Sequence, residues 1–259
     1  YLEDIDNSMS IDQIKNPASG LLWQQLTAET PNFAYTDSAY WLHIKLSNTS
    51  NQSIDRVIEI EYPVLDYIDF YQVNSGQIAQ QFKAGDRRPY SDRPIAHRNF
   101  IFPISLEAKS KSSLFIKVKS SSSLQIPISI ASERQFFANE QLDLMRMCVY
   151  YGMMAVMILF NLFIFFSLRE AMYLYYVSFI FCFAAVQFCL HGMAGQYIWP
   201  EKSYIQDFCI LIFVPSIVLF ASMFARHFLN LANNAPFADR FFKLMCWIAI
   251  AGIASGLVL

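Results

Sequence analysis

Four long stretches of this sequence contain no charged side chain. They span residues 147–168, 171–190, 208–225 and 244–259, and short polar segments connect them. An α-helix rises about 1.5 Å per residue, so about 20 apolar residues cross the hydrocarbon core of a bilayer. Helices buried in a large soluble protein are the alternative, and four such runs in close succession disfavour it. The sequence therefore predicts a membrane protein with four helical spans.

The ends of the chain and the interior of these runs add two expectations. The last run is still apolar at Leu259, and no initiator methionine or signal peptide precedes Tyr1. We therefore expect a truncated part of a longer protein. A charge in hydrocarbon is costly and is kept for a function, so its absence from the runs disfavours an ion-coupled transporter or an intramembrane enzyme.

The first part of the chain, residues 1–135, has the pattern of short strands separated by turn residues. The segment "YWLHIKLSN" (40–48) alternates large apolar residues with Trp41, His43 and Lys45, which is the period of a strand. Residues 65–82 resemble a hairpin with "NSG" at its turn. Together these features predict an all-β jelly-roll sandwich followed by an α-helical transmembrane bundle. The side chains expected to be largely buried are Leu42, Ile44, Leu46, Ile58, Ile60, Ile68, Phe70, Ile116 and Val118.

We divide the chain into three parts. Residues 1–135 form the sandwich, residues 136–146 a helical connector, and residues 147–259 the first four membrane helices. The composition of residues 133–146 is helical, so we expect the connector to continue directly into the first membrane helix.

Motifs of catalysis and cofactor binding are missing from the sequence. The histidines, at positions 43, 97, 191 and 227, have no metal-ligand spacing, and there is no phosphate-binding glycine loop or nucleophile elbow. We expect no catalytic residue, no metal and no cofactor in the chain, and no nucleic-acid partner.

One loop of the N-terminal part concentrates positive charge. The segment "DRRPYSDRPIAHRNF" (86–100) holds four arginines, and two interpretations remain open. In the structural one, Asp86 and Asp92 pair with neighbouring arginines, each exposed pair contributing ~0–1 kcal/mol. In the binding one, guanidinium groups hold a polar or anionic ligand such as a carbohydrate, an aromatic ring stacks on it, and a histidine adds pH dependence. The candidate ligand-binding residues are Trp41, Asp86, Tyr90, Arg93, His97 and Arg98.

Several stretches resemble one family. They are "YLEDIDNSMSIDQI", "NFAYTDSAYWLHIKLSN", "GDRRPYSDRPIAHRNFIFPI", "SSLFIKVKSSSSLQIPISIAS", "YYGMMAVMILFNLFIFFSLREAMYLYYVSF" and "GMAGQYIWPE". With these stretches the chain resembles the bacterial seven-transmembrane receptors with diverse intracellular signalling modules. Two positions depart from the family pattern, since Ala34 stands where the family tends to have Gly and His43 where it tends to have Arg. In the loop, Arg93 and Arg98 match the pattern, whereas Arg87 and Arg88 do not.

The resemblance implies a function and an orientation. The sandwich would be a periplasmic sensor domain of a multi-pass protein in the bacterial inner membrane, on the same side as Lys202, with Arg169, Arg240 and Lys243 on the other side. Three further helices and a cytoplasmic output domain, commonly a diguanylate cyclase or a histidine kinase, would follow. The chain would be the ligand-sensing and transmembrane half of a signal-transduction receptor; the alternative is a transporter or channel component with an accessory β domain.

The expected partners follow from that function. They are a small-molecule or carbohydrate-like ligand and the lipid bilayer, and a homodimer is left open. Within the loop, we expect Arg93 and Arg98 to matter more than Arg87 and Arg88.

Overall fold

A computed structural model describes residues 1–16, 20–26, 28, 30–202 and 204–258. The chain forms two compact units. The first comprises Tyr1–Asn139 together with His191–Ser203, and the second comprises Glu140–Leu190 together with Tyr204–Leu259.

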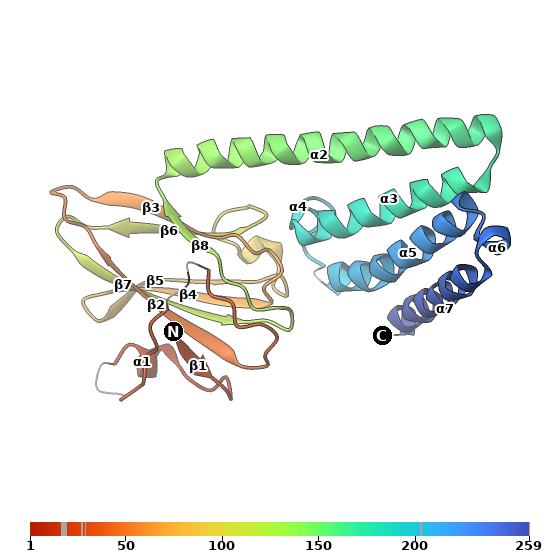
Figure 1. The fold of residues 1–259 in the computed structure, drawn as a ribbon. Coiled ribbons are helices and arrows are strands. Elements are labelled where there is room, and N and C mark those ends of the chain that lie inside the picture. The colour runs from red at the N-terminus through yellow and green to blue at the C-terminus, as the bar shows by residue number, and fades with distance from the viewer. Residues whose placement is uncertain (17–19, 27, 29, 203, 259) are drawn as a thin grey trace. The chain divides into compact units, whose positions relative to one another are not determined.

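The first unit is built on two antiparallel β-sheets (Figure 1). In the described part of the chain, one sheet has the strand order β1-β2-β7-β4-β5 and the other has the order β6-β3-β8. The predicted β-sandwich is therefore confirmed. The strands are β1 (Leu2–Asp4), β2 (Ala39–Ser47), β3 (Ile54–Ile60), β4 (Tyr67–Asn74), β5 (Gln77–Ala84), β6 (Phe100–Leu106), β7 (Lys111–Lys119) and β8 (Ile128–Ala131).

The core of the first unit lies between the two sheets. Phe70 of the larger sheet stacks on Phe102 of the smaller one, with 4.6 Å between ring centroids, and the surrounding aliphatic side chains are buried. The predicted core positions belong to this cluster, and seven are fully buried: Leu42, Ile58, Ile60, Ile68, Phe70, Ile116 and Val118. Ile44 and Leu46 pack against the cluster but are only partly buried, because they lie in the second half of β2, toward its end at Ser47.

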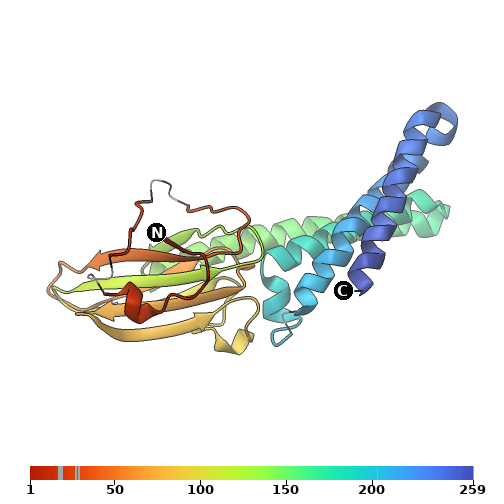
Figure 2. The ribbon, with the colours of Figure 1, turned by 90° about the horizontal axis from the view of Figure 1, so that it is seen from below.

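The outer face of the five-stranded sheet has a smaller apolar cluster of its own. Trp41 and Phe115 of this face pack against Ile14 of the short helix α1 (Ile11–Ile14), which Figure 2 shows in front of the sheet. The indole N–H of Trp41 donates to Asp4 (3.4 Å), and Trp41 is only 1% exposed. The alternation in β2 therefore correctly predicts on which face of the sheet each side chain lies. The outer face is nevertheless partly buried, because the N-terminal segment covers it.

The left-handed backbone region is used at several positions, and two of these segments bear on the sequence analysis. The β4–β5 hairpin turns at Ser75 (φ +51°) and Gly76 (φ +83°), as the "NSG" signal predicts, because positive φ at both central residues matches the twist of the strands. Ala34 also has a positive φ, of +57°. Glycine adopts this conformation without a Cβ penalty, which gives a physical reason for the family's preference for glycine at this position.

Four helices of the described chain are long and apolar enough to cross a membrane. They are α2 (Glu133–Leu168), α3 (Ala171–Leu190), α5 (Tyr204–Phe228) and α7 (Pro236–Val258). The helix α2 is continuous, as expected for residues 133–146. The short helix α6 (Leu231–Asn234) lies between α5 and α7.

In the second unit α5 packs between α3 and α7. Small residues on α7 permit close approach, since a side chain added at Gly252 would lie 3.2 Å from Pro215 Cβ. Glycines four residues apart, here Gly252 and Gly256, form such a contact face in membrane helices. At the other end of these helices, Asp239 pairs with Arg226 (2.7 Å) and Lys243 (2.8 Å).

Candidate functional site

The arginine-rich loop joins β5 to β6 and contains the 3-10 turn η2 (Tyr90–Asp92). Its four arginines fall into two pairs. We call Arg87 and Arg88 the first pair and Arg93 and Arg98 the second pair, because the two pairs have different kinds of partner.

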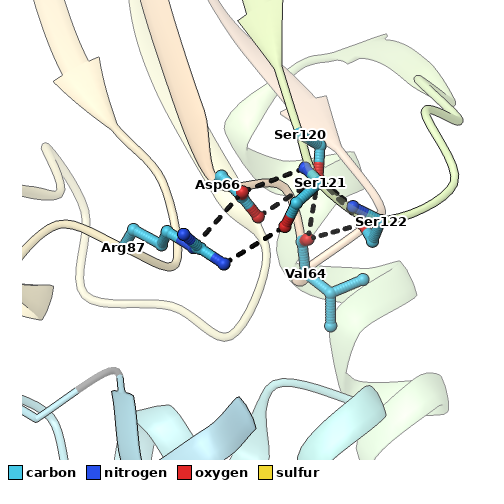
Figure 3. A network of polar contacts seen from close by, with 6 residues as sticks. All are labelled: Val64, Asp66, Arg87, Ser120, Ser121 and Ser122. Carbon is cyan, nitrogen blue, oxygen red and sulfur yellow. Dashed lines mark hydrogen bonds and ion pairs between the residues drawn. The ribbon is translucent and has the colours of Figure 1, made fainter. Parts of the chain in front are cut away.

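Arg87 belongs to a polar network around Asp66, which directly precedes β4 (Figure 3). The Asp66 carboxylate faces Arg87 Nε at 3.3 Å and accepts the backbone N–H of Ser121 (2.9 Å) and the hydroxyl of Ser120 (3.2 Å). Arg87 also donates to the hydroxyl of Ser121 (3.2 Å). This network fastens the start of the loop to the segment after β7.

Arg88 lies against β4. Its guanidinium pairs with Asp69 (2.8 Å), donates to the carbonyls of Ile68 (3.0 Å) and Ala84 (3.2 Å), and lies 5.5 Å from the ring centroid of Tyr67. The first pair thus binds carboxylates from β4 and its start, Asp66 and Asp69, which the sequence analysis did not name.

Arg93 holds the second half of the loop together. Its guanidinium donates to the carbonyls of His97 (2.7 Å) and Arg98 (2.9 Å) and lies between two rings, 4.7 Å from the centroid of Tyr90 and 4.5 Å from that of Phe100. Burial lowers the pKa of Arg93 to about 10, so the group is still charged at neutral pH. Two carbonyls and two ring faces therefore stabilise this buried cation.

His97 and Asn99 continue the buried half of the loop. His97 Nδ1 accepts the backbone N–H of Asn99 (3.1 Å), and the His97 ring packs edge-on against Phe136 in the first turn of α2 (5.4 Å between centroids). The Asn99 side chain donates to Glu59 (2.7 Å). The loop thus contacts both the smaller sheet and the start of α2.

The segment 191–203, which connects α3 to α5 and contains α4 (Met193–Tyr197), also belongs to the first unit. Figure 1 shows α4 beside the arginine-rich loop. The N–H of Tyr90 donates to the carbonyl of Pro200 (3.0 Å), and the hydroxyl of Ser91 donates to Glu201 (3.4 Å). The connection between two membrane helices is therefore bound to the arginine-rich loop.

Gly192 shows how close this approach is. Its φ is +73°, and a side chain there would lie 2.7 Å from Pro63 Cβ and 2.8 Å from the carbonyl oxygen of Arg98. Only glycine fits both the conformation and the space. Next to it, burial and then the charge of Arg98 lower the pKa of His191.

A pocket of about 340 Å³ opens on the outer face of the five-stranded sheet. Its lining comes from β4, β7, the segment after β1 and Arg88 of the first pair. The lining residues are Asn7, Tyr67, Asp69, Arg88, Lys117 and Lys119. The pocket is predominantly cationic, and it lies near Arg88 rather than near the second pair.

Two family models cover most of the chain. The model described as "7TMR-DISM extracellular 2" matches residues 1–132, and the one described as "7TM diverse intracellular signalling" matches residues 144–259. The chain belongs to the 7TMR-DISM receptors. These families indicate a membrane receptor with an extracellular sensor domain and a seven-transmembrane signalling domain. No curated protein matches the chain.

For a 7TMR-DISM receptor, the bound 191–203 segment bears on topology. This segment belongs to the same unit as the sandwich, which matches the extracellular family model. The predicted topology places the turn at Arg169 on the other side of the membrane from this segment, and this stays a prediction.

The structure brings most of the predicted site residues together in this receptor. Tyr90, Arg93, His97 and Arg98 share the second half of the loop, and the N–H of Asp86 donates to the carbonyl of Leu65 at its start (2.8 Å). Trp41 packs elsewhere, beneath the N-terminal segment. Their role in ligand binding stays a prediction.

Five of the pocket residues were missed by the sequence analysis, which included only Arg88 in its loop. The alternation of "YIDF" and "FIKVK" places Tyr67 and Asp69 on one face of β4 and Lys117 and Lys119 on one face of β7. The sequence pattern does not predict that these two strands pair with each other. In the described residues, no group of three or more His, Cys, Asp or Glu side chains could hold a metal.

Proposed function

We propose that this chain is the ligand-sensing and transmembrane half of a bacterial receptor that binds a small polar or carbohydrate-like ligand in the periplasm. It passes the change across the inner membrane to a cytoplasmic output domain, a diguanylate cyclase or a histidine kinase, in the rest of the protein. The chain itself acts by binding and conformational coupling, without turnover.

The binding of the 191–203 segment to the arginine-rich loop carries this proposal. A change in the sandwich has two routes to the membrane helices. One is the continuous helix α2, which follows the sandwich in the chain, and the other is the α3–α5 connection, which contacts the arginine-rich loop. A packed contact with discrete partners, such as Tyr90 with Pro200 and Gly192 with Pro63, transmits small displacements better than a free loop, because packed interfaces switch rather than deform smoothly.

The alternative is a transporter or channel component with an accessory β domain. Such proteins place ionisable side chains inside the bilayer, where they mark the path of the solute. The three runs 147–168, 171–190 and 208–225 have no Asp, Glu, Lys or Arg, which favours the receptor.

A reversible cross-link tests the proposal in the full-length receptor. Ser91→Cys and Glu201→Cys, in a background without the native cysteines, are bridged by a short bis-methanethiosulfonate reagent, and cyclic di-GMP production and autophosphorylation are measured. The matched control bridges Ser53→Cys and Ser105→Cys, whose hydroxyls also lie close together (3.3 Å) but on β6 and next to β3.

The receptor proposal expects the 91–201 bridge to change the output and reductant to restore it, while the 53–105 bridge has no effect. Unchanged output with both bridges would contradict it. Solute uptake by proteoliposomes that is blocked only by the 91–201 bridge would instead favour the transporter.

A further inference from the structure

The pocket on the outer face of the five-stranded sheet is lined by none of the residues predicted to bind the ligand. It is formed where β4 and β7 pair, with Asp69 opposite Lys117 and Tyr67 opposite Lys119. Side chains opposite each other in antiparallel strands lie within about 5.5 Å. The strand pairing therefore places two lysines, a carboxylate and an aromatic ring in one hollow, which Arg88 borders.

Two of the three cations in the pocket are already neutralised. Arg88 pairs with Asp69 (2.8 Å). Lys117 pairs with the buried Asp4 (3.0 Å) and donates to the carbonyls of Met9 (3.2 Å) and Asn7 (3.4 Å), which uses its three N–H groups. These two side chains shape the pocket, and their charges are balanced.

Lys119 is different. Among the residues that the structure describes, its ammonium group has no ion pair and no hydrogen bond, although the residue is only partly exposed. The pocket therefore has one uncompensated positive charge. On the neighbouring strand, the exposed Lys83 is paired in register with Asp69 and strengthens the positive potential. A partly buried cation without a counter-ion attracts an anion more strongly than a fully solvated one, because screening is weaker.

The other lining residues indicate what the ligand contains besides an anionic group. Within the described residues the lining has no aliphatic side chain, so an apolar ligand body gains little. The oxygens of Asp69 and Asn7 accept hydrogen bonds from hydroxyl groups, and the Tyr67 ring, in a residue 40% exposed, offers a face to C–H groups. A volume of about 340 Å³ is at the lower end of the ~300–1,000 Å³ of small-molecule sites.

We propose that this pocket binds a small hydroxylated carboxylate, with a sugar acid as the type, whose carboxylate pairs with Lys119 and whose hydroxyls face Asp69 and Asn7. This inference rests on the proposed sensing function and names the class of its ligand. An uncharged sugar leaves Lys119 without a counter-ion. A zwitterionic amino acid needs a free carboxylate for its ammonium group, and Asp69 is already paired with Arg88.

Binding is measured on the full chain in nanodiscs by saturation-transfer NMR and calorimetry. The probes are D-glucuronate and D-galacturonate, with D-glucose, D-galactose, glycine and inorganic phosphate for comparison. We expect saturable binding of at least one sugar acid and a Kd about 10-fold or more higher in Lys119→Gln, which loses a charge-assisted hydrogen bond. The control is Lys45→Gln, an exposed lysine on β2 outside the pocket, which should bind as the unaltered chain does.

Because the Lys119 ammonium group has no ion pair or hydrogen bond within the described residues, the melting temperature of Lys119→Gln should stay unchanged. Equal binding of neutral sugars, binding of glycine or phosphate alone, no binding of either sugar acid, or full binding by Lys119→Gln would each overturn the inference.

The output of the full-length receptor, measured with the same probes, separates this inference from the receptor function. Lys119-dependent binding that leaves the output unchanged supports the pocket and contradicts its sensing role. An output that responds to the 91–201 bridge, without sugar-acid binding, supports the receptor and overturns the pocket.

Discussion

The two arginine pairs of the β5–β6 loop have the same chemistry and opposite surroundings. Arg87 and Arg88 pair with carboxylates of β4 and its start, and the Arg87 side chain is still 45% exposed. Arg93 is enclosed by two rings and two carbonyls, in the half of the loop that contacts the α3–α5 connection. Arginines that are close in sequence therefore have two different roles. Arg88 lines the cationic pocket, whereas Arg93 holds the second half of the loop together.

Removing Arg93 should have the largest effect. Arg93→Ala leaves two carbonyls without their donor and a void between two rings, so we expect the free energy of unfolding of the sandwich to fall by about 2–4 kcal/mol. Urea titration of the full chain in micelles, followed by tryptophan fluorescence, measures it. Arg87→Ala serves as the comparison, and equal losses for the two variants would erase the distinction between the pairs.

Gly192→Ala should have the next largest effect, because it acts on the surface that the second pair supports. The added Cβ meets Pro63 and the carbonyl of Arg98 in a backbone conformation unfavourable for alanine, at a cost of about 1–3 kcal/mol. We expect faster proteolysis within residues 191–203. Gly152→Ala is the control, since nothing lies within 4 Å of that position on α2; similar cleavage rates for both variants would show that the connection is not closely packed.

Acidification should loosen the same contact by a smaller amount. Burial and Arg98 lower the pKa of His191 in the folded chain, so the unfolded state binds the proton more readily. The stabilising contribution is complete above the ordinary histidine pKa of about 6.5 and declines as the pH falls from there through the folded value. Protection of residues 191–203 from proteolysis should therefore decrease between pH 7.5 and 5.5, and less so in His191→Gln. The same decrease in both proteins would assign it to another group.

Arg87→Gln should have the smallest effect. Its ion pair with Asp66 is 3.3 Å long and half-exposed, and such pairs contribute ~0–1 kcal/mol. Asp66→Asn should lower the free energy of unfolding more than Arg87→Gln does, because the buried carboxylate also accepts hydrogen bonds from Ser120 and Ser121. If urea titration shows a larger loss of unfolding free energy for Arg87→Gln than for Asp66→Asn, the arginine and not the carboxylate organises the network.

Local pattern was enough to predict most of the fold. The alternation in "YWLHIKLSN" gave the faces of β2, "NSG" gave the hairpin turn, and the continuous composition after residue 133 gave the start of α2. These features depend on neighbours in sequence, which is why they can be predicted. The spacing of Gly252 and Gly256, which marks the α7 face against α5, was equally visible and was missed.

The sites depended on pairings between distant segments. Lys119 meets Tyr67 only because β7 pairs with β4, and Gly192 meets Pro63 only because a connection between membrane helices folds onto the sandwich. No periodicity in the sequence predicts either of these contacts. The loop was correctly placed between two strands, yet two of its carboxylate partners, Asp66 and Asp69, lie outside it on or next to β4.

The attachment of residues 191–203 to the sandwich also limits how such a receptor can be recombined. A chimera that exchanges only residues 1–132 would leave Gly192, Pro200 and Glu201 facing a foreign surface without their partners. The exchangeable sensor is therefore discontinuous in sequence, an N-terminal domain together with a distant connection, and the two pieces have to be inherited or engineered together.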